Sequence, residues 1–139
     1  MGQVHCTATL TNVVDYAEAR KGTLTEDKVR KIVLTNMLAD SGARGLGLPK
    51  SVIAQLGLIP LNKMPINTAN GKVNSQRFGG LMITIQNRTI TTDCFELPDT
   101  TPPLLGAVKM QDMGIELDLQ NEKLILLPET GDDTYHCFY

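Results

Sequence analysis

Short strand-like segments separated by turn residues recur along the chain, and this pattern restricts the fold more than any other feature. The segments 4–14, 29–40 and 46–48 are rich in Val, Ile, Leu and Thr. Three hairpins are predicted further along: 64–69 with 72–78, 81–86 with 89–95, and 115–119 with 123–127. Turn signals spaced about eight to twelve residues apart predict a small barrel-like or sandwich-like β domain.

Two short helices are predicted between these strands. The first spans 49–56, with Pro49 at its first position and Gly57 ending it. The second spans 107–113 and ends at Gly114. The polar segment 15–27 contains Gly22 and is predicted to be an irregular loop. We therefore expect a mainly β chain with two short helices.

Size and composition favour one domain. The 139 residues are 42% hydrophobic, which is enough for a single core. We expect the domain to span 1–128 and a C-terminal tail to span 129–139. Three of the six aromatic residues lie at the end of this tail: Tyr135, Phe138 and Tyr139.

Several kinds of partner find no support in the sequence. The net charge is −2 and no basic run occurs, so no nucleic-acid partner is expected. No apolar stretch reaches the length of a membrane span, and no signal peptide is recognisable, so a cytoplasmic protein without a membrane partner is expected. The cysteines (Cys6, Cys94 and Cys137) are expected to be free thiols. His5 and His136 lack further ligands at metal spacing, so no metal or other cofactor is expected.

One segment carries candidate chemistry. Asp40, Ser41, Gly42 and Ala43 follow the apolar segment that ends at Ala39. Asp-Ser-Gly is also ordinary turn chemistry, so the triplet by itself favours a structural turn over a catalytic aspartate.

A second segment, downstream, changes this balance. Pro103-Leu104-Leu105-Gly106 precedes the second predicted helix and the closing strand predicted at 115–119. Together with Asp40-Ser41-Gly42-Ala43 and the hairpin around Asn70-Gly71, this order resembles the retroviral-type (retropepsin-like) aspartic proteases. Bacterial single-domain members look closest, and the resemblance covers about 29–127, most of the chain.

The resemblance implies a small closed-barrel-like acid protease subunit with a flap hairpin. It makes Asp40 the catalytic residue, with Ser41, Gly42 and Ala43 supporting the active-site loop. Leu104, Leu105 and Gly106 match the residues that pack under that loop. The flap and cleft positions expected to meet substrate are Arg44, Thr68, Ala69, Asn70, Gly71 and Lys72.

A chain of this kind supplies one catalytic aspartate, so the resemblance implies a homodimer that hydrolyses peptide bonds in peptide or protein substrates. Two adjacent carboxylates share a proton, and the pair activates a water molecule. The alternative is a non-catalytic module of the same fold that dimerises or binds extended peptides by strand addition. A metal-dependent hydrolase lacks candidate ligands.

Arg44, Ala107 and Val108 depart from the family pattern, and the terminal strands and the aromatic tail have no fixed role. Arg44 stands where several retroviral members carry an acid, and Ala107 and Val108 replace an arginine and a polar residue, so a brace of the viral dimer is missing. Arg44 is either a surface arginine or a residue that favours an acidic substrate side chain. The strands 4–10 and 123–127 are candidates for the dimer sheet. The aromatic tail caps that sheet, lies in the cleft, or is a frayed terminus.

Overall fold

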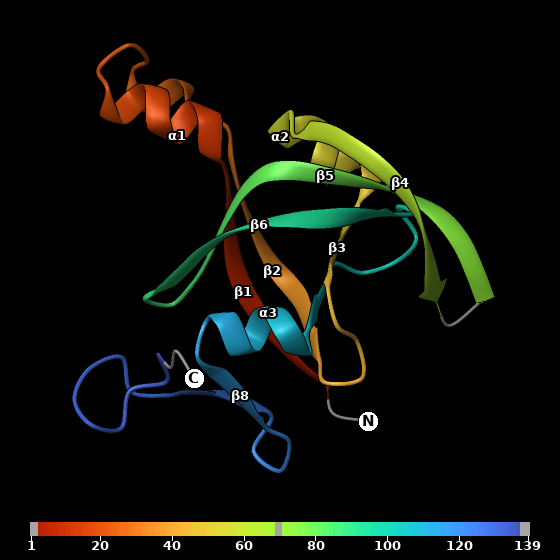
Figure 1. Cartoon of the computed structure of the whole chain (residues 1–139), viewed down its shortest axis with the longest axis vertical. Coiled ribbons are helices and arrows are strands. Elements are labelled where there is room, and N and C mark those ends of the chain that lie inside the picture. The colour runs from red at the N-terminus through yellow and green to blue at the C-terminus, as the bar shows by residue number, and fades with distance from the viewer. Residues whose placement is uncertain (1–2, 69–70, 137–139) are drawn as a thin grey trace.

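The computed structural model describes residues 3–68 and 71–136. Figure 1 shows a twisted, strand-rich body with helices at its periphery. The elements are β1 (Gln3–Asn12), α1 (Val13–Arg20), a 3-10 helix (Glu26–Lys28), β2 (Lys31–Asp40), β3 (Leu46–Pro49), α2 (Lys50–Leu56), β4 (Ile59–Thr68), β5 (Gly71–Ile85), β6 (Arg88–Leu97), β7 (Leu104–Gly106), α3 (Ala107–Asp112), β8 (Ile115–Asp118) and β9 (Lys123–Leu126).

Six of the strands close into a barrel. The main sheet has the order β1-β2-β7-β3-β6-β5-β4, and an additional pairing joins β1 to β5. This pairing runs from Thr9 opposite Thr84 to Asn12 opposite Leu81. It closes the ring and leaves β4 outside it as an edge strand. The expected mainly β, closed-barrel-like fold is therefore confirmed.

The barrel interior holds the core. Strand side chains alternate between the two faces of a sheet, so one apolar set per strand points inward. The largest fully buried side chains come from β1, β2, β3, α2, β5, β6, β7 and the end of α3: Leu10, Met37, Leu46, Leu48, Leu56, Leu81, Ile83, Ile85, Cys94, Leu105 and Met113. Strands distant in sequence thus share one core.

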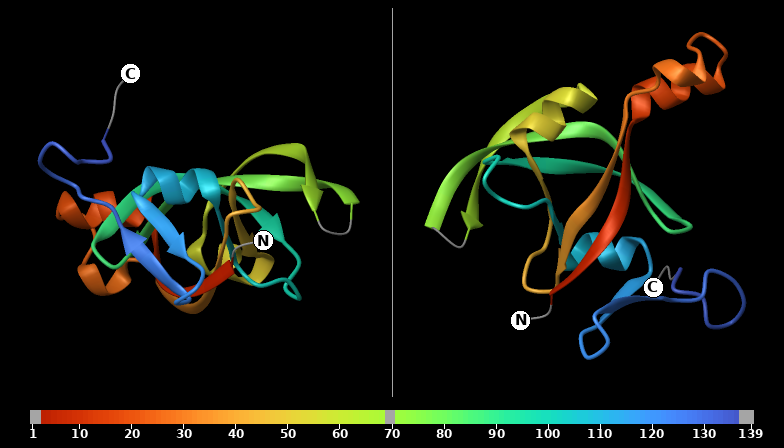
Figure 2. Two further views of the ribbon diagram at one scale, coloured as in Figure 1. Left: turned by 90° about the horizontal axis from the view of Figure 1, so that it is seen from below. Right: turned by 180° about the vertical axis from the view of Figure 1, so that it is seen from behind.

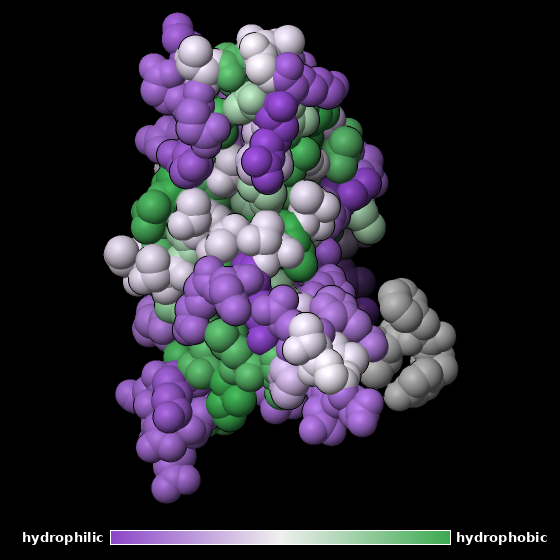
Figure 3. Space-filling model, turned by 90° about the vertical axis from the view of Figure 1, so that its left-hand side faces the viewer, coloured by the Kyte–Doolittle hydropathy of each residue, from purple (hydrophilic) through white to green (hydrophobic). Residues whose placement is uncertain are grey.

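The segment after β1 differs from its prediction. Residues 13–20 form α1, so the expected strand end and irregular loop are wrong there, and the described chain has three α-helices instead of two. The cause is a cap: the Asn12 side chain accepts a hydrogen bond from the Asp15 amide at 2.9 Å. The Asp15 carboxylate also accepts a hydrogen bond from Arg30 Nε at 2.7 Å, which ties α1 to the residue before β2. The end of the molecule that carries α1 is largely hydrophilic in Figure 3.

The predicted hairpins and the α2 region agree closely with the structure. Pro49 ends β3 and caps α2 instead of occupying its first turn, and Gly57 ends the helix with φ +60°. The strands predicted at 72–78 and 81–86 are one continuous strand, β5, with a register shift between Phe78 and Leu81. Gly80 absorbs this bulge at φ +81°.

The C-terminal part lies beside the barrel. Among the described strands, β8 and β9 pair only with each other, as an antiparallel hairpin below α3 (Figure 2, right). The buried Arg88 guanidinium then binds the Gly114 carbonyl at 3.3 Å, the Leu127 carbonyl, and Glu129 at 3.0 Å. Tyr135 lies under the same guanidinium at 5.1 Å. The described part of the tail therefore docks at Arg88, whereas Phe138 and Tyr139 lie outside the described residues.

Candidate active site

Asp40 is the last residue of β2, one of the six strands that form the barrel. β2 pairs in parallel with β7, which places Ala39 opposite Leu105 and Asp40 opposite Gly106. Ala39 and Leu105 are both fully buried. Asp40 itself is half-buried, because the strand leaves the core at this point and turns into an exposed loop. The fold thus places the Asp40 carboxyl group at the point where β2 leaves the barrel core.

The Asp40 carboxylate is oriented from both sides. The Gly42 amide donates to Oδ1 at 2.8 Å, and the Gln3 side-chain amide donates to Oδ2 at 3.1 Å. The Ala43 amide donates to the Asp40 carbonyl at 3.2 Å and closes the turn. Ser41 and Gly42 are exposed on the outside of this turn. Sequence reasoning identified the loop but missed Gln3, because the β1–β2 pairing that brings it there joins residues far apart in the chain.

The segment after β7 fixes the loop that follows Asp40. Gly106 donates to the Gly45 carbonyl at 2.8 Å, Ala107 to Ala43 at 2.7 Å, and Val108 to Arg44 at 3.1 Å. A Cβ atom on Gly106 would lie 2.3 Å from the Arg44 carbonyl carbon, so only glycine fits without movement of the backbone. The structure thus brings 104–106 against the loop that follows Asp40.

The β4–β5 hairpin extends from the barrel (Figure 1) and has two unlike faces. Paired residues share a face, and Ile66 stands opposite Val73 while Met64 stands opposite Ser75. Ser75 on this face is buried and donates to the Glu96 carbonyl at 2.9 Å. This face therefore turns toward the barrel at Ser75, whereas Met64 and Val73 farther along it are exposed.

The opposite face of the hairpin carries Lys63, Asn67, Lys72 and Asn74, all exposed. At the end of the hairpin, Thr68 Oγ1 donates to the Gly71 carbonyl at 2.8 Å. The predicted tip residues Ala69 and Asn70 lie outside the described residues.

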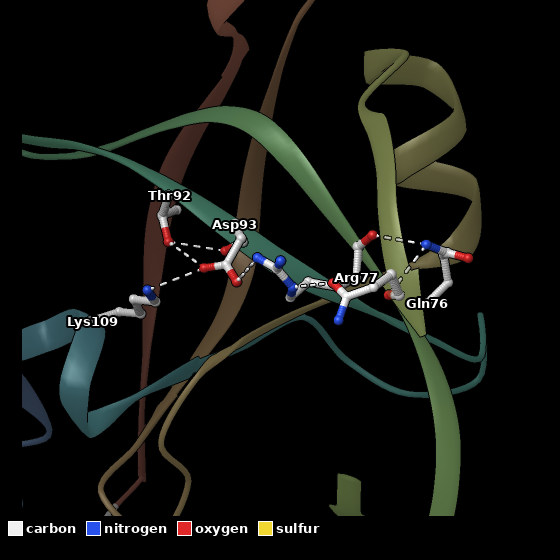
Figure 4. Close-up of polar contacts among 6 residues, drawn as sticks. Gln76, Arg77, Thr92, Asp93 and Lys109 are labelled. Carbon is white, nitrogen blue, oxygen red and sulfur yellow. Dashed lines mark hydrogen bonds and ion pairs between the residues drawn. The ribbon is translucent and has the colours of Figure 1, made fainter. Parts of the chain in front are cut away.

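A polar network that the sequence did not reveal joins the hairpin base to α3 (Figure 4). Arg77 Nε donates to Asn62 Oδ1 at 2.8 Å, and the same guanidinium binds Asp93 at 2.9 Å. Lys109 binds the other Asp93 oxygen at 3.3 Å. Burial alone would raise the pKa of Asp93. The Arg77 hydrogen bond and the Lys109 charge outweigh burial and hold that pKa below its ordinary value.

Cysteine nucleophiles are disfavoured in the described part of the chain. Burial raises the pKa of the Cys6 thiol to about 11. Burial, together with the Asp93 charge, raises the pKa of Cys94 to about 12. Since the thiolate is the reactive form, neither thiol is activated at neutral pH. Across residues 3–68 and 71–136, no group of three or more His, Cys, Asp or Glu side chains could hold a metal ion.

Of the comparisons with known proteins, the one with solved structures supports the fold. No family model matches the sequence, and no curated protein matches it. Among solved structures, the protease of EIAV, complexed with the inhibitor HBY-793, aligns with a TM-score of 0.52 and 22% sequence identity. The alignment covers 83% of this chain and 93% of that protease chain. The chain therefore has the fold of a retroviral protease subunit, whereas a particular closeness to bacterial members stays a prediction.

The described helices are all short and carry polar residues. No helix within the described ranges is long and apolar enough to cross a bilayer.

Proposed function

We propose that this protein is an aspartic endopeptidase that works as a homodimer, with Asp40 of each subunit forming the catalytic pair. One observation carries the proposal: the Asp40 carboxylate stands at the end of β2, directly after the buried Ala39 and beside β7, in the fold of a retroviral protease subunit. A carboxylate at this position, braced by the Gly42 amide, is placed for acid–base work on a bound peptide.

The chemistry requires two such groups. Two carboxylates a few ångströms apart cannot both ionise cheaply, so the pair holds one proton between them. The ionised member takes a proton from a water molecule as that water attacks the scissile carbonyl carbon. The protonated member donates to the carbonyl oxygen, which gives a tetrahedral diol. Proton transfer to the leaving nitrogen then breaks the C–N bond and releases an amine and a carboxylic acid.

The need for a second aspartate leads to a dimer. The Asp-Ser-Gly-Ala motif occurs once in the sequence, so each chain supplies one Asp40. A twofold axis near Asp40 brings the two copies together through a self-complementary interface. The start of β1 suits this interface, because β1 pairs with β5 only from Thr9 onward and leaves its earlier edge open. Ile125 on β9, the other strand expected to join the dimer sheet, is exposed and adds apolar surface there.

The β4–β5 hairpin suits the role of a flap over the substrate. Its inner face carries Met64, Ile66 and Val73, which would contact an extended peptide and exclude water. Its outer strand, β4, contains Pro60 and Pro65. Proline cannot donate a ladder hydrogen bond, so this edge is protected from pairing with other chains while the flap is open.

The test is cleavage of a mixed, unstructured peptide library by wild type and by Asp40→Asn, from acid to neutral pH, read by mass spectrometry. We expect cleavage by wild type and a loss of at least about 1,000-fold in Asp40→Asn, since the dyad performs every proton transfer. Asp27→Asn, an exposed acid in the 3-10 helix, is the matched control and should keep full activity. A folded, dimeric wild type that cleaves nothing would instead make the protein a peptide-binding module of this fold.

A further inference from the structure

A pocket opens beside the loop that follows Asp40, at the loop residues Arg44 and Gly45. Its volume is about 230 Å³, and its lining comes from the loop, β3, β6 and α3: Arg44, Gly45, Leu46, Asp93, Phe95, Val108 and Lys109. The Ala43 and Arg44 carbonyls accept from the Ala107 and Val108 amides, so the pocket lies against the loop that follows Asp40.

The charges around the pocket are unequal. Asp93 is already paired with Arg77 at 2.9 Å and with Lys109 at 3.3 Å. The Arg44 side chain is exposed and makes no salt bridge with any described acid. Of the residues that line the pocket, Arg44 and Lys109 are cationic and Asp93 is anionic, so the lining carries a net charge of +1. Arg44 is the member whose guanidinium is open to a ligand.

The pocket is also preformed. The Arg44 carbonyl accepts from the Val108 amide at 3.1 Å, and the Gly45 carbonyl accepts from Gly106 at 2.8 Å. The Asp93–Lys109 ion pair fixes the opposite wall (Figure 4). Among the lining residues, Leu46 is buried, and Phe95 and Val108 are half-buried. Such a site offers apolar contact to a short methylene stem and a guanidinium to its end.

We propose that this pocket is a specificity subsite for an acidic side chain of the peptide, glutamate before aspartate, with Arg44 as the specificity-determining residue. The proposal rests on the proposed peptidase function and deepens it. Glutamate is favoured because its two methylenes can lie against Phe95 and Val108 while its carboxylate reaches Arg44. Arginine pairs with a carboxylate through two parallel hydrogen bonds, which lysine or a neutral residue cannot reproduce.

The test compares peptides that differ at one position only, with Glu, Asp, Gln or Lys placed in turn at each position around the bond that wild type cleaves. At the position that fills the pocket, we expect kcat/KM for Glu to exceed that for Gln about tenfold, as a partly exposed charge-assisted pair allows. Arg44→Ala should abolish this preference, and Arg44→Glu should favour the Lys peptide. Arg20→Ala, on the distant α1, is the control and should keep the wild-type profile.

Binding separates this proposal from the peptidase proposal. Fluorescently labelled Glu and Gln peptides are titrated with Asp40→Asn, alone and combined with Arg44→Ala. Tighter binding of the Glu peptide that disappears with Arg44→Ala and weakens with added salt supports the subsite, whether or not wild type cleaves. Absence of cleavage alone overturns only the peptidase.

Three results would overturn the subsite. The first is no acidic preference at any position in cleavage and binding, and the second is an acidic preference that survives Arg44→Ala. The third is an equal loss of kcat/KM for all peptides in Arg44→Ala. The third, with a shift to monomer in analytical ultracentrifugation, would make Arg44 a dimer contact.

Discussion

Gly106 gives the sharpest test of how the loop after Asp40 is held. A Cβ atom there would lie 2.3 Å from the Arg44 carbonyl carbon and 2.6 Å from the Arg44 and Gly45 carbonyl oxygens. Carbon atoms pack at about 3.5–4.0 Å, so Gly106→Ala forces the loop to move by about 1 Å. That movement strains the three hydrogen bonds from 106–108 to 43–45, which now measure 2.8, 2.7 and 3.1 Å.

The expected cost follows from these contacts. Overpacking costs about 1–3 kcal/mol, and each weakened hydrogen bond adds up to about 1 kcal/mol, so the free energy of unfolding should fall by about 2–4 kcal/mol. In a chain of this size the Tm should fall by about 10 °C. Urea unfolding followed by circular dichroism measures the first quantity, and a thermal scan measures the second.

Gly45→Ala is the matched control, because its Cβ would lie 3.9 Å from the Phe95 ring, an ordinary contact. We expect a change within about 1 kcal/mol for this variant. The reasoning is refuted if Gly106→Ala is as stable as wild type, or no less stable than Gly45→Ala.

Two further predictions concern the ion pairs. Asp93→Asn should lower the free energy of unfolding by about 1 kcal/mol at pH 7, because it removes the carboxylate that Arg77 and Lys109 share. Because the folded-state pKa of Asp93 is lowered, this contribution is complete above the ordinary aspartate pKa of about 3.9 and is lost as pH falls through the lower folded value. Urea unfolding from pH 7 to pH 2.5 checks this, and a difference from wild type that persists at the lowest pH would contradict it. Arg88→Met should cost about 3 kcal/mol, since it leaves buried carbonyls without donors, and should expose 127–136 to limited proteolysis. Unchanged stability and protease resistance would show that Arg88 does not anchor this segment.

Local chemistry accounts for the parts of the fold that the sequence predicts. Gln120-Asn121 lies between β8 and β9 as expected, whereas the turn predicted at Asn87-Arg88 lies one residue earlier, at Gln86-Asn87. Gly57 and Gly114 follow helices with positive φ. The approximate strand positions and the end of β2 at Asp40 follow from apolar patterning and turn residues alone.

The failures have equally specific causes. The Asn12 side chain accepts from the Asp15 amide, and this N-cap makes a helix, α1, of a segment expected to be a loop. Asparagine is typical of both helix caps and turns, so the sequence alone does not distinguish the two. Barrel closure through β1 and β5 depends on pairing between residues about seventy positions apart, which no local pattern encodes. The Arg77–Asp93–Lys109 network is invisible for the same reason, because each partner is an ordinary scattered charge until β5, β6 and α3 meet.

The central claim, that one active site needs Asp40 from two chains, is tested most directly by mixing. Wild type and Asp40→Asn are combined at constant total concentration, allowed to exchange subunits, and assayed on one cleavable peptide. If only dimers with two Asp40 residues are active, activity falls as the square of the wild-type fraction, to about a quarter at equal parts. A linear fall, to about half at equal parts, would show that each subunit works alone and would contradict the account.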